Sequence, residues 1–111
     1  MREIKAIIRP DRLPDVVHAL REIPRMPGVT VSVVHGFGRG GPQQPSAASD
    51  PFGEAQFIKV ETVVPVGLVD QVIERIRRAA HTGRPGDGKL FVIPVEHVMR
   101  LSTGERDQEA V

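Results

Sequence analysis

The spacing of hydrophobic residues along the chain predicts six secondary-structure elements. Alternating apolar and polar residues, or runs of β-branched residues, predict strands over residues 4–8, 29–36, 56–64 and 90–93. Apolar residues at helical spacing predict one helix that starts at Asp11 and is broken at Pro24, and a second over residues 66–80. Asp11 is a candidate N-cap of the first helix, and Pro14 falls early enough to be tolerated in its first turn.

The order strand, helix, strand, strand, helix, strand is typical of a split βαβ, or ferredoxin-like, arrangement. We therefore expect an α+β fold, a βαββαβ sandwich in which two helices cover one face of a four-stranded antiparallel sheet. At 111 residues the chain has room for one such domain, so residues 1–111 are expected to form a single unit with a C-terminal segment at 99–111. This fold hosts many unrelated functions, so the function must be argued from particular sites.

A long segment between the second and third predicted strands shows neither helical nor strand periodicity. From Gly36 to Ala55 it contains five glycines and three prolines, with few apolar residues between them. Loops of this length inside a compact domain are usually functional or disordered. Residues 37–55 are therefore a candidate functional loop, although their composition does not name a task.

Composition and charge argue against several classes of function. The formal net charge is +1 with basic and acidic residues interspersed, so neither a nucleic acid nor an anionic membrane is favoured as a partner. The chain has no cysteine, which excludes disulfides and thiolate chemistry and suits a reducing cytoplasm. No apolar run approaches the roughly 18 residues of a membrane span, so direct membrane insertion is not expected. Without Trp or Tyr, the sheet lacks the stacking platform of RNA-binding proteins with this fold.

The strongest chemical signal is a glycine-rich segment at residues 82–89. Three glycines permit close approach of the backbone to a phosphate, and Lys89 supplies a cation to neutralise it. The segment matches the G-x-x-x-x-G-K part of the P-loop pattern, but Leu90 replaces the Ser or Thr, and a strand follows where a P-loop has a helix. A P-loop is therefore rejected. Two interpretations remain, a phosphate-binding loop of another kind or a tight connection between the second helix and the last strand.

Several segments carry a resemblance to a known family. They are Gly36-Phe37-Gly38-Arg39, Val63-Val64-Pro65, the run from Ala79 to Lys89, and Arg100-Leu101-Ser102-Thr103-Gly104-Glu105, with a similar opening at residues 4–10. They occur in order over nearly the whole chain, and T-G-x-x-G-D-G-K after the second helix is the most specific of them. Together they resemble the signatures of the nitrogen regulatory P-II signal-transduction proteins.

This resemblance implies a homotrimer that binds ATP or ADP in clefts between subunits and contacts a partner protein through residues 37–55, the T-loop of the family. By motif matching, the phosphates would be held by Gly86, Asp87, Gly88 and Lys89, with added positive charge from Arg39 and Arg100. The cleft at the base of the T-loop would be lined by Gly36, Phe37 and Gly38, and adenine would be surrounded by Ile7, Thr30 and Val64. These last three are strand residues that would lie in a core or a subunit interface in any case.

Some positions depart from the family pattern. Gly40 stands where nitrogen-sensing members carry a Gln that helps to hold magnesium and 2-oxoglutarate, and Phe57 aligns with a lysine near the end of the loop, although Lys59 could partly replace it. The chain has no tyrosine to be uridylylated, and Ser102 replaces a common arginine. The part played by magnesium is therefore left open, and a divergent member is implied.

Three functions are compatible with these observations. The first is a nucleotide-responsive regulator of a membrane transporter or an enzyme. The second uses ADP or AMP with another input, a small anion such as bicarbonate or a metal-stress signal. The third is a weak ATPase, but catalysis has no visible constellation, and the four histidines lack the spacing of metal ligands. We expect a regulator, not an enzyme, with no resident metal.

Overall fold

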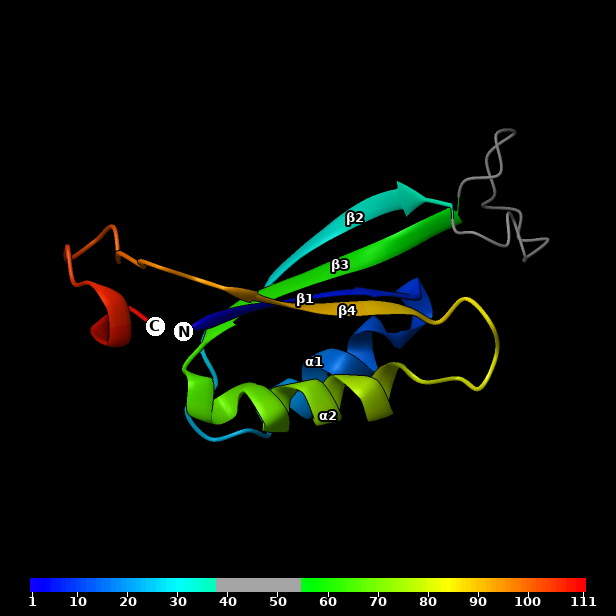
Figure 1. Ribbon diagram of the computed structural model, residues 1–111. Coiled ribbons are helices and arrows are strands. Elements are labelled where there is room, and N and C mark those ends of the chain that lie inside the picture. The colour runs from blue at the N-terminus through cyan, green and yellow to red at the C-terminus, as the bar shows by residue number, and fades with distance from the viewer. Residues whose placement is uncertain (38–54) are drawn as a thin grey trace.

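The computed structural model describes residues 1–37 and 55–111, and it has the expected ferredoxin-like architecture. Its four strands are β1 (Arg2–Ile8), β2 (Thr30–Gly36), β3 (Ala55–Val64) and β4 (Gly88–Pro94). They form one antiparallel sheet in the order β2-β3-β1-β4. Two helices, α1 (Leu13–Arg21) and α2 (Val69–Ala80), lie together on one face of the sheet (Figure 1). The predicted βαββαβ fold is therefore confirmed.

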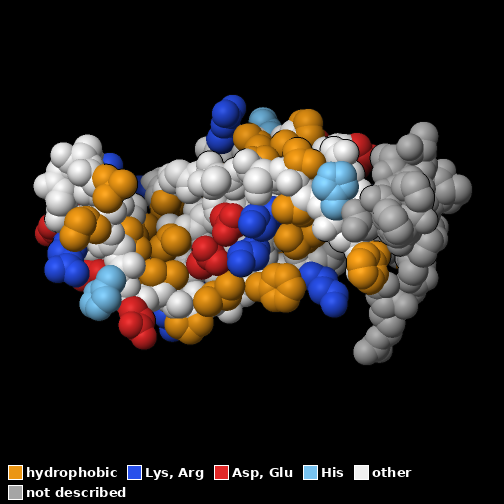
Figure 2. Space-filling model, turned by 90° about the horizontal axis from the view of Figure 1, so that it is seen from above, with side chains coloured by type: hydrophobic (Ala, Val, Ile, Leu, Met, Phe, Trp, Pro, Cys, Tyr) orange, Lys and Arg blue, Asp and Glu red, His pale blue; other side chains and the backbone are white. Residues whose placement is uncertain are grey.

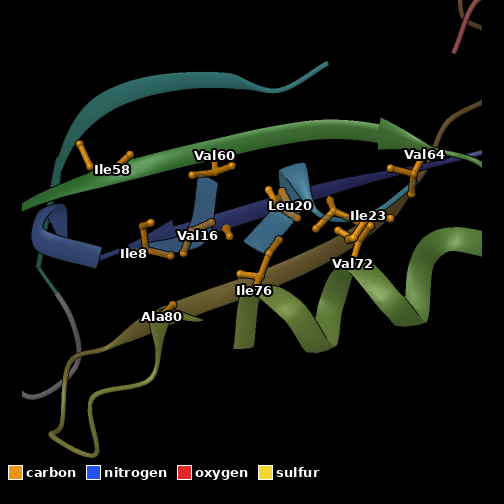
Figure 3. Packing of buried hydrophobic residues seen from close by; sticks show 12 residues of the cluster. Ile8, Val16, Leu20, Ile23, Ile58, Val60, Val64, Val72, Ile76 and Ala80 are labelled. Carbon is orange, nitrogen blue, oxygen red and sulfur yellow. The ribbon is translucent and has the colours of Figure 1, made fainter. Parts of the chain in front are cut away.

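The hydrophobic core lies between the sheet and the two helices. Every second residue from Ile4 to Ile8 in β1 and from Ile58 to Val64 in β3 points toward the helices and is buried, which is the alternation read from the sequence. Figure 3 shows these side chains meeting those of α1 and α2. The core consists of Ile4, Ala6, Ile8, Val16, Leu20, Ile23, Ile58, Val60, Val64, Val72, Ile76 and Ala80.

Each helix is entered through a short 3-10 turn, which places its start later than the sequence predicts. Before α1 the turn spans Pro10–Arg12 and is closed by a 3.0 Å hydrogen bond from the backbone N–H of Arg12 to the carbonyl of Arg9. The prediction that Asp11 caps this helix is wrong, because the turn moves the N-cap to Arg12, which makes no side-chain capping bond. The equivalent turn before α2 spans Val66–Leu68.

The opposite face of the sheet is not covered by any described element. Figure 2 shows charged side chains gathered at its middle with apolar side chains around them. The charges include two ion pairs within strands, Lys5–Glu3 at 3.8 Å and Lys59–Glu61 at 3.5 Å. The neighbouring β4 leaves Phe91 and other large apolar residues exposed. We call this surface the open face.

Two irregular segments extend from opposite ends of the sheet (Figure 1). At one end, residues 81–87 connect α2 to β4, close to the end of β1. At the other, the chain after β4 forms a hairpin in which Met99 and Arg106 make an isolated bridge, and it returns toward the N-terminus. No helix in the described ranges is long and apolar enough to cross a membrane.

Candidate functional site

Three glycines shape the predicted phosphate-binding loop. After α2 ends at Ala80, the chain turns back into β4 through Gly83, Gly86 and Gly88, whose φ angles are +84°, +89° and +110°. Side chains other than glycine rarely adopt these angles. A Cβ on Gly88 would also lie 1.7 Å from the carbonyl oxygen of Ile7. The loop therefore lies directly on the end of β1, and glycine is needed at the point of closest approach.

The Asp87 carboxylate points into the loop and fastens its two ends together. Its Oδ2 accepts a 2.8 Å hydrogen bond from the backbone N–H of Thr82, and its Oδ1 accepts one from the Thr82 hydroxyl. The same Oδ1 accepts a 3.0 Å bond from Nε of Arg9. Burial acts to raise the pKa of Asp87, but the hydrogen bonds from Thr82 and Arg9 outweigh it and hold that pKa well below its usual value. Asp87 is therefore a charged residue that shapes the loop.

Arg9 and Thr82 both bond to Asp87, a role that the sequence alone does not assign to them. In the sequence Arg9 is only the end of a strand, yet in the structure it is 8% exposed and its Nη2 donates a 2.6 Å hydrogen bond to the carbonyl of Pro85. A buried arginine needs partners, and both of its contacts lie in the loop. An arginine directly after a buried strand is the only sequence feature that points to this role. Its partners could not be inferred from the sequence, because they are 76 and 78 positions away in the chain.

Lys89 and Ile7 lie side by side on the open face at this end of the sheet. They are register partners across β1 and β4, and Lys59 is the partner of Ile7 on the other side. Directly paired residues of antiparallel strands share a face, so the Lys89 side chain projects beside that of Ile7. Lys89 is exposed. The structure therefore brings Ile7 and Lys89 together beside Gly86, Asp87 and Gly88.

The base of the long loop lies at the same end. β2 ends at Gly36, which pairs with Ala55 at the start of β3. The next residue, Phe37, is 73% exposed. The other two predicted site residues of this run, Gly38 and Arg39, lie outside the described residues, as does Gly40.

The remaining predicted site residues lie toward the other end of the sheet, with Thr30 at the register of Lys5 in the middle of β1. There Thr30 and Arg100 line one cavity of about 510 Å³, together with residues 61–63 and the C-terminal residue Val111. Arg100 places its Nε 3.6 Å from Oε1 of Glu105. Val64 is at this end too, but its side chain is fully buried in the core, where Figure 3 shows it on the helix side of the sheet.

The two groups lie apart along the length of the sheet within one chain. Val64 pairs with Arg2 at the start of β1, whereas Lys89 pairs with Ile7 near its end. Five residues of strand separate these positions, which corresponds to roughly 17 Å. The predicted site is therefore divided between the two ends of the molecule.

Comparison with known proteins identifies the family. The family model described as nitrogen regulatory protein P-II matches residues 1–105. Relatives named nitrogen regulatory protein P-II are 43% identical in Azospirillum brasilense and 42% identical in Synechocystis sp., in both cases over 100% of each chain. A crystal structure of Arabidopsis thaliana PII bound to citrate is 40% identical, covers 99% of this chain and 91% of that chain, and gives a TM-score of 0.82.

The chain therefore belongs to the P-II family of nitrogen regulatory, signal-transduction proteins. Members of this family are regulators and not enzymes.

Proposed function

We propose that this protein is a homotrimer that binds ATP or ADP in the clefts between its subunits. The division of the predicted site between the two ends of the sheet carries this proposal. One end of the sheet carries the loop of residues 82–88 (the loop end), and the other carries the hairpin that follows β4 (the hairpin end). If neighbouring subunits meet head to tail, the loop end of one copy faces the hairpin end of the next. Ile7 and Lys89 of one subunit would then share a ligand with Thr30 and Arg100 of its neighbour.

The open face supports assembly of several copies. An antiparallel sheet can leave one face in water, but that face is then normally polar. Here Phe91 is 46% and Ile93 is 38% exposed on the open face, around the central ion pairs. Packing this face against other copies would remove apolar surface from water at about 25 cal/mol for each Å².

The loop end has the chemistry expected for phosphates. Backbone turns with positive φ at glycine form concave arrangements of N–H groups that bind anions. Gly86 and Gly88 supply such turns, and the exposed Lys89 places an ammonium group beside them. Arg39 of the same subunit and Arg100 of the neighbour would add two further cations. Ile7, Thr30 and the backbone of Val64 would then lie around adenine, with Gly36, Phe37 and Gly38 lining the cleft at the base of the long loop.

Signalling would pass from the nucleotide to residues 37–55, which begin directly beside the loop end of the cleft. We propose that ATP and ADP favour different arrangements of this segment, and that only some of them dock on a partner protein, a membrane transporter or an enzyme. The cysteine-free chain suits the cytoplasm, where we expect it to act as one domain over residues 1–111. In the alternative form of this proposal, a small anion such as bicarbonate acts as the second effector together with ADP or AMP.

Sedimentation and calorimetry together test this function. We expect a trimer at micromolar concentration that binds ATP and ADP, and a stable monomer would contradict the shared cleft. Lys89→Ala should weaken nucleotide binding by about 1.5–3 kcal/mol, the usual range for a hydrogen bond to a charged group. Arg78→Ala is the matched control, because it removes an exposed cation from α2 on the other side of the sheet. Unchanged affinity in a folded Lys89→Ala trimer would remove residues 83–89 from the phosphate site.

A further inference from the structure

Arg9 is a largely buried arginine whose side chain bonds to the loop of residues 82–88. It follows the last residue of β1 and is buried beneath the loop of residues 82–88, with its side chain 10% exposed. Its Nε donates to Asp87 at 3.0 Å and its Nη2 donates to the carbonyl of Pro85 at 2.6 Å. Two of the guanidinium nitrogens, Nε and Nη2, are therefore engaged by the loop.

The loop is packed against this guanidinium group over several consecutive residues. Pro85 and Asp87 are bonded to it, and a Cβ placed on Gly86 between them would lie 3.5 Å from Nη2. The rigid fork of an arginine can engage two loop positions at once, which a lysine ammonium cannot do in the same geometry. Arg9 thus fixes the loop segment that the proposed function assigns to the phosphates.

The bond from Arg9 to Asp87 also reduces the repulsion that the Asp87 carboxylate would exert on a phosphate. Asp87 brings a negative charge within two residues of Lys89, and an unpaired carboxylate there would repel a phosphate. The bonds from Arg9 and Thr82 pair this charge within the loop.

We propose that Arg9 is a positioning residue for the nucleotide phosphates. It holds the loop of residues 82–88 in the shape that binds them, and Asp87 acts through Arg9 and Thr82 instead of contacting the phosphates itself. This inference rests on the proposed nucleotide-binding function and adds to it the distinction between residues that touch the ligand and residues that shape its site.

The dependence of affinity on the number of phosphates tests this inference. Arg9→Lys keeps the charge but loses the fork, so we expect ATP and ADP to bind at least tenfold more weakly in calorimetric titrations, while adenosine affinity changes less than twofold. The matched control is Arg12→Lys. Arg12 also anchors backbone through two hydrogen bonds, of 3.0 and 2.8 Å, but both go to the carbonyl of Ala79 in α2. Arg12→Lys should change the affinities for ATP, ADP and adenosine by the same factor or leave all three unchanged.

Asp87→Asn gives a second test, because the two possible roles of Asp87 predict changes of opposite sign in ATP affinity. If Asp87 shapes the loop, the amide cannot accept from all three of its donors, and ATP binding should weaken several-fold. If its charge faces the phosphates, removal of that charge should tighten ATP binding, which would overturn the inference.

Failure of the inference can be told apart from failure of the proposed function. Wild-type protein that binds no adenine nucleotide would refute both. Wild-type protein that binds ATP, with an Arg9→Lys variant that loses affinity for ATP and adenosine by the same factor, would refute only the positioning role.

Discussion

Replacing Gly88 with alanine would measure how closely the loop of residues 82–88 is packed on the sheet. Gly88 is the first residue of β4, pairs with Ile8 and has a φ of +110°. An added Cβ would lie 1.7 Å from the carbonyl oxygen and 2.8 Å from the carbonyl carbon of Ile7. Both atoms belong to the backbone of β1, so the clash cannot be relieved unless the two strands separate.

The cost of this substitution can be worked out from two contributions. A residue other than glycine in a sparsely populated φ/ψ region costs about 1–3 kcal/mol. Separating the first residues of β4 from β1 loses one or two strand hydrogen bonds, at about 0.5–1.5 kcal/mol each. We therefore expect Gly88→Ala to lower the free energy of unfolding by about 1.5–6 kcal/mol, compared with a total of about 5–15 kcal/mol for a typical domain.

Two other glycines provide a graded comparison. Gly86 also has a positive φ, of +89°, but its added Cβ would meet only Arg9 Nη2 at 3.5 Å, so Gly86→Ala should cost about 1–2 kcal/mol from backbone strain. At Gly67 no atom of the described residues, apart from its chain neighbours, lies within 4 Å of the added Cβ, so Gly67→Ala should change stability little. Urea unfolding at one fixed protein concentration would compare the three variants, because assembly makes stability depend on concentration. If Gly88→Ala and Gly67→Ala differ by less than about 0.5 kcal/mol, the packing argument is wrong.

Two further predictions concern charge. Because the pKa of Asp87 is lowered in the folded protein, its contribution to stability is present above its unfolded value of about 4 and is lost as pH falls through the folded pKa. Acid unfolding should therefore be less steep in Asp87→Asn than in the wild type, and identical pH profiles would contradict this. ATP with magnesium should not gain tenfold in affinity, about 1.4 kcal/mol, when 2-oxoglutarate is added, because Gly40 and Phe57 provide neither a magnesium ligand nor a cation for its distal carboxylate. Calorimetric titration with and without 2-oxoglutarate decides this.

Most of the fold could be predicted because one face of each central strand is buried. The alternation of Ile4, Ala6 and Ile8 with less buried neighbours is enough to locate β1 and its inward face. The residues at which the strands begin and end were less predictable. β4 extends from Gly88 to Pro94, beyond the predicted residues 90–93, because its length is set by pairing with the whole of β1. Hydrogen bonds to a distant strand leave no trace in the local sequence.

The candidate site was predictable only where its residues are adjacent in the chain. Gly86, Gly88 and Lys89 form one short motif, and their backbone requirements can be inferred from glycine and lysine alone. Arg9 could not be found in this way, because its partners lie more than 70 residues away and are brought to it by the return of α2 and β4 alongside β1. The sequence also could not show that Asp87 points inward, since a carboxylate in such a motif could face either side.

The division of the site follows from strand direction. β3 and β4 both run antiparallel to β1, so the end of β1 lies beside the starts of both strands, and the start of β1 lies beside their ends. A motif at the start of β4, such as Lys89, is therefore placed at the opposite end of the molecule from residues that follow β4, such as Arg100. A ligand that contacts both motifs would therefore have to span the length of the sheet within one copy or lie between two copies. The same topology leaves the open face of the sheet uncovered by the described residues (Figure 2), so under the proposed function one packing of neighbouring copies would both cover this face and bring the two motifs together.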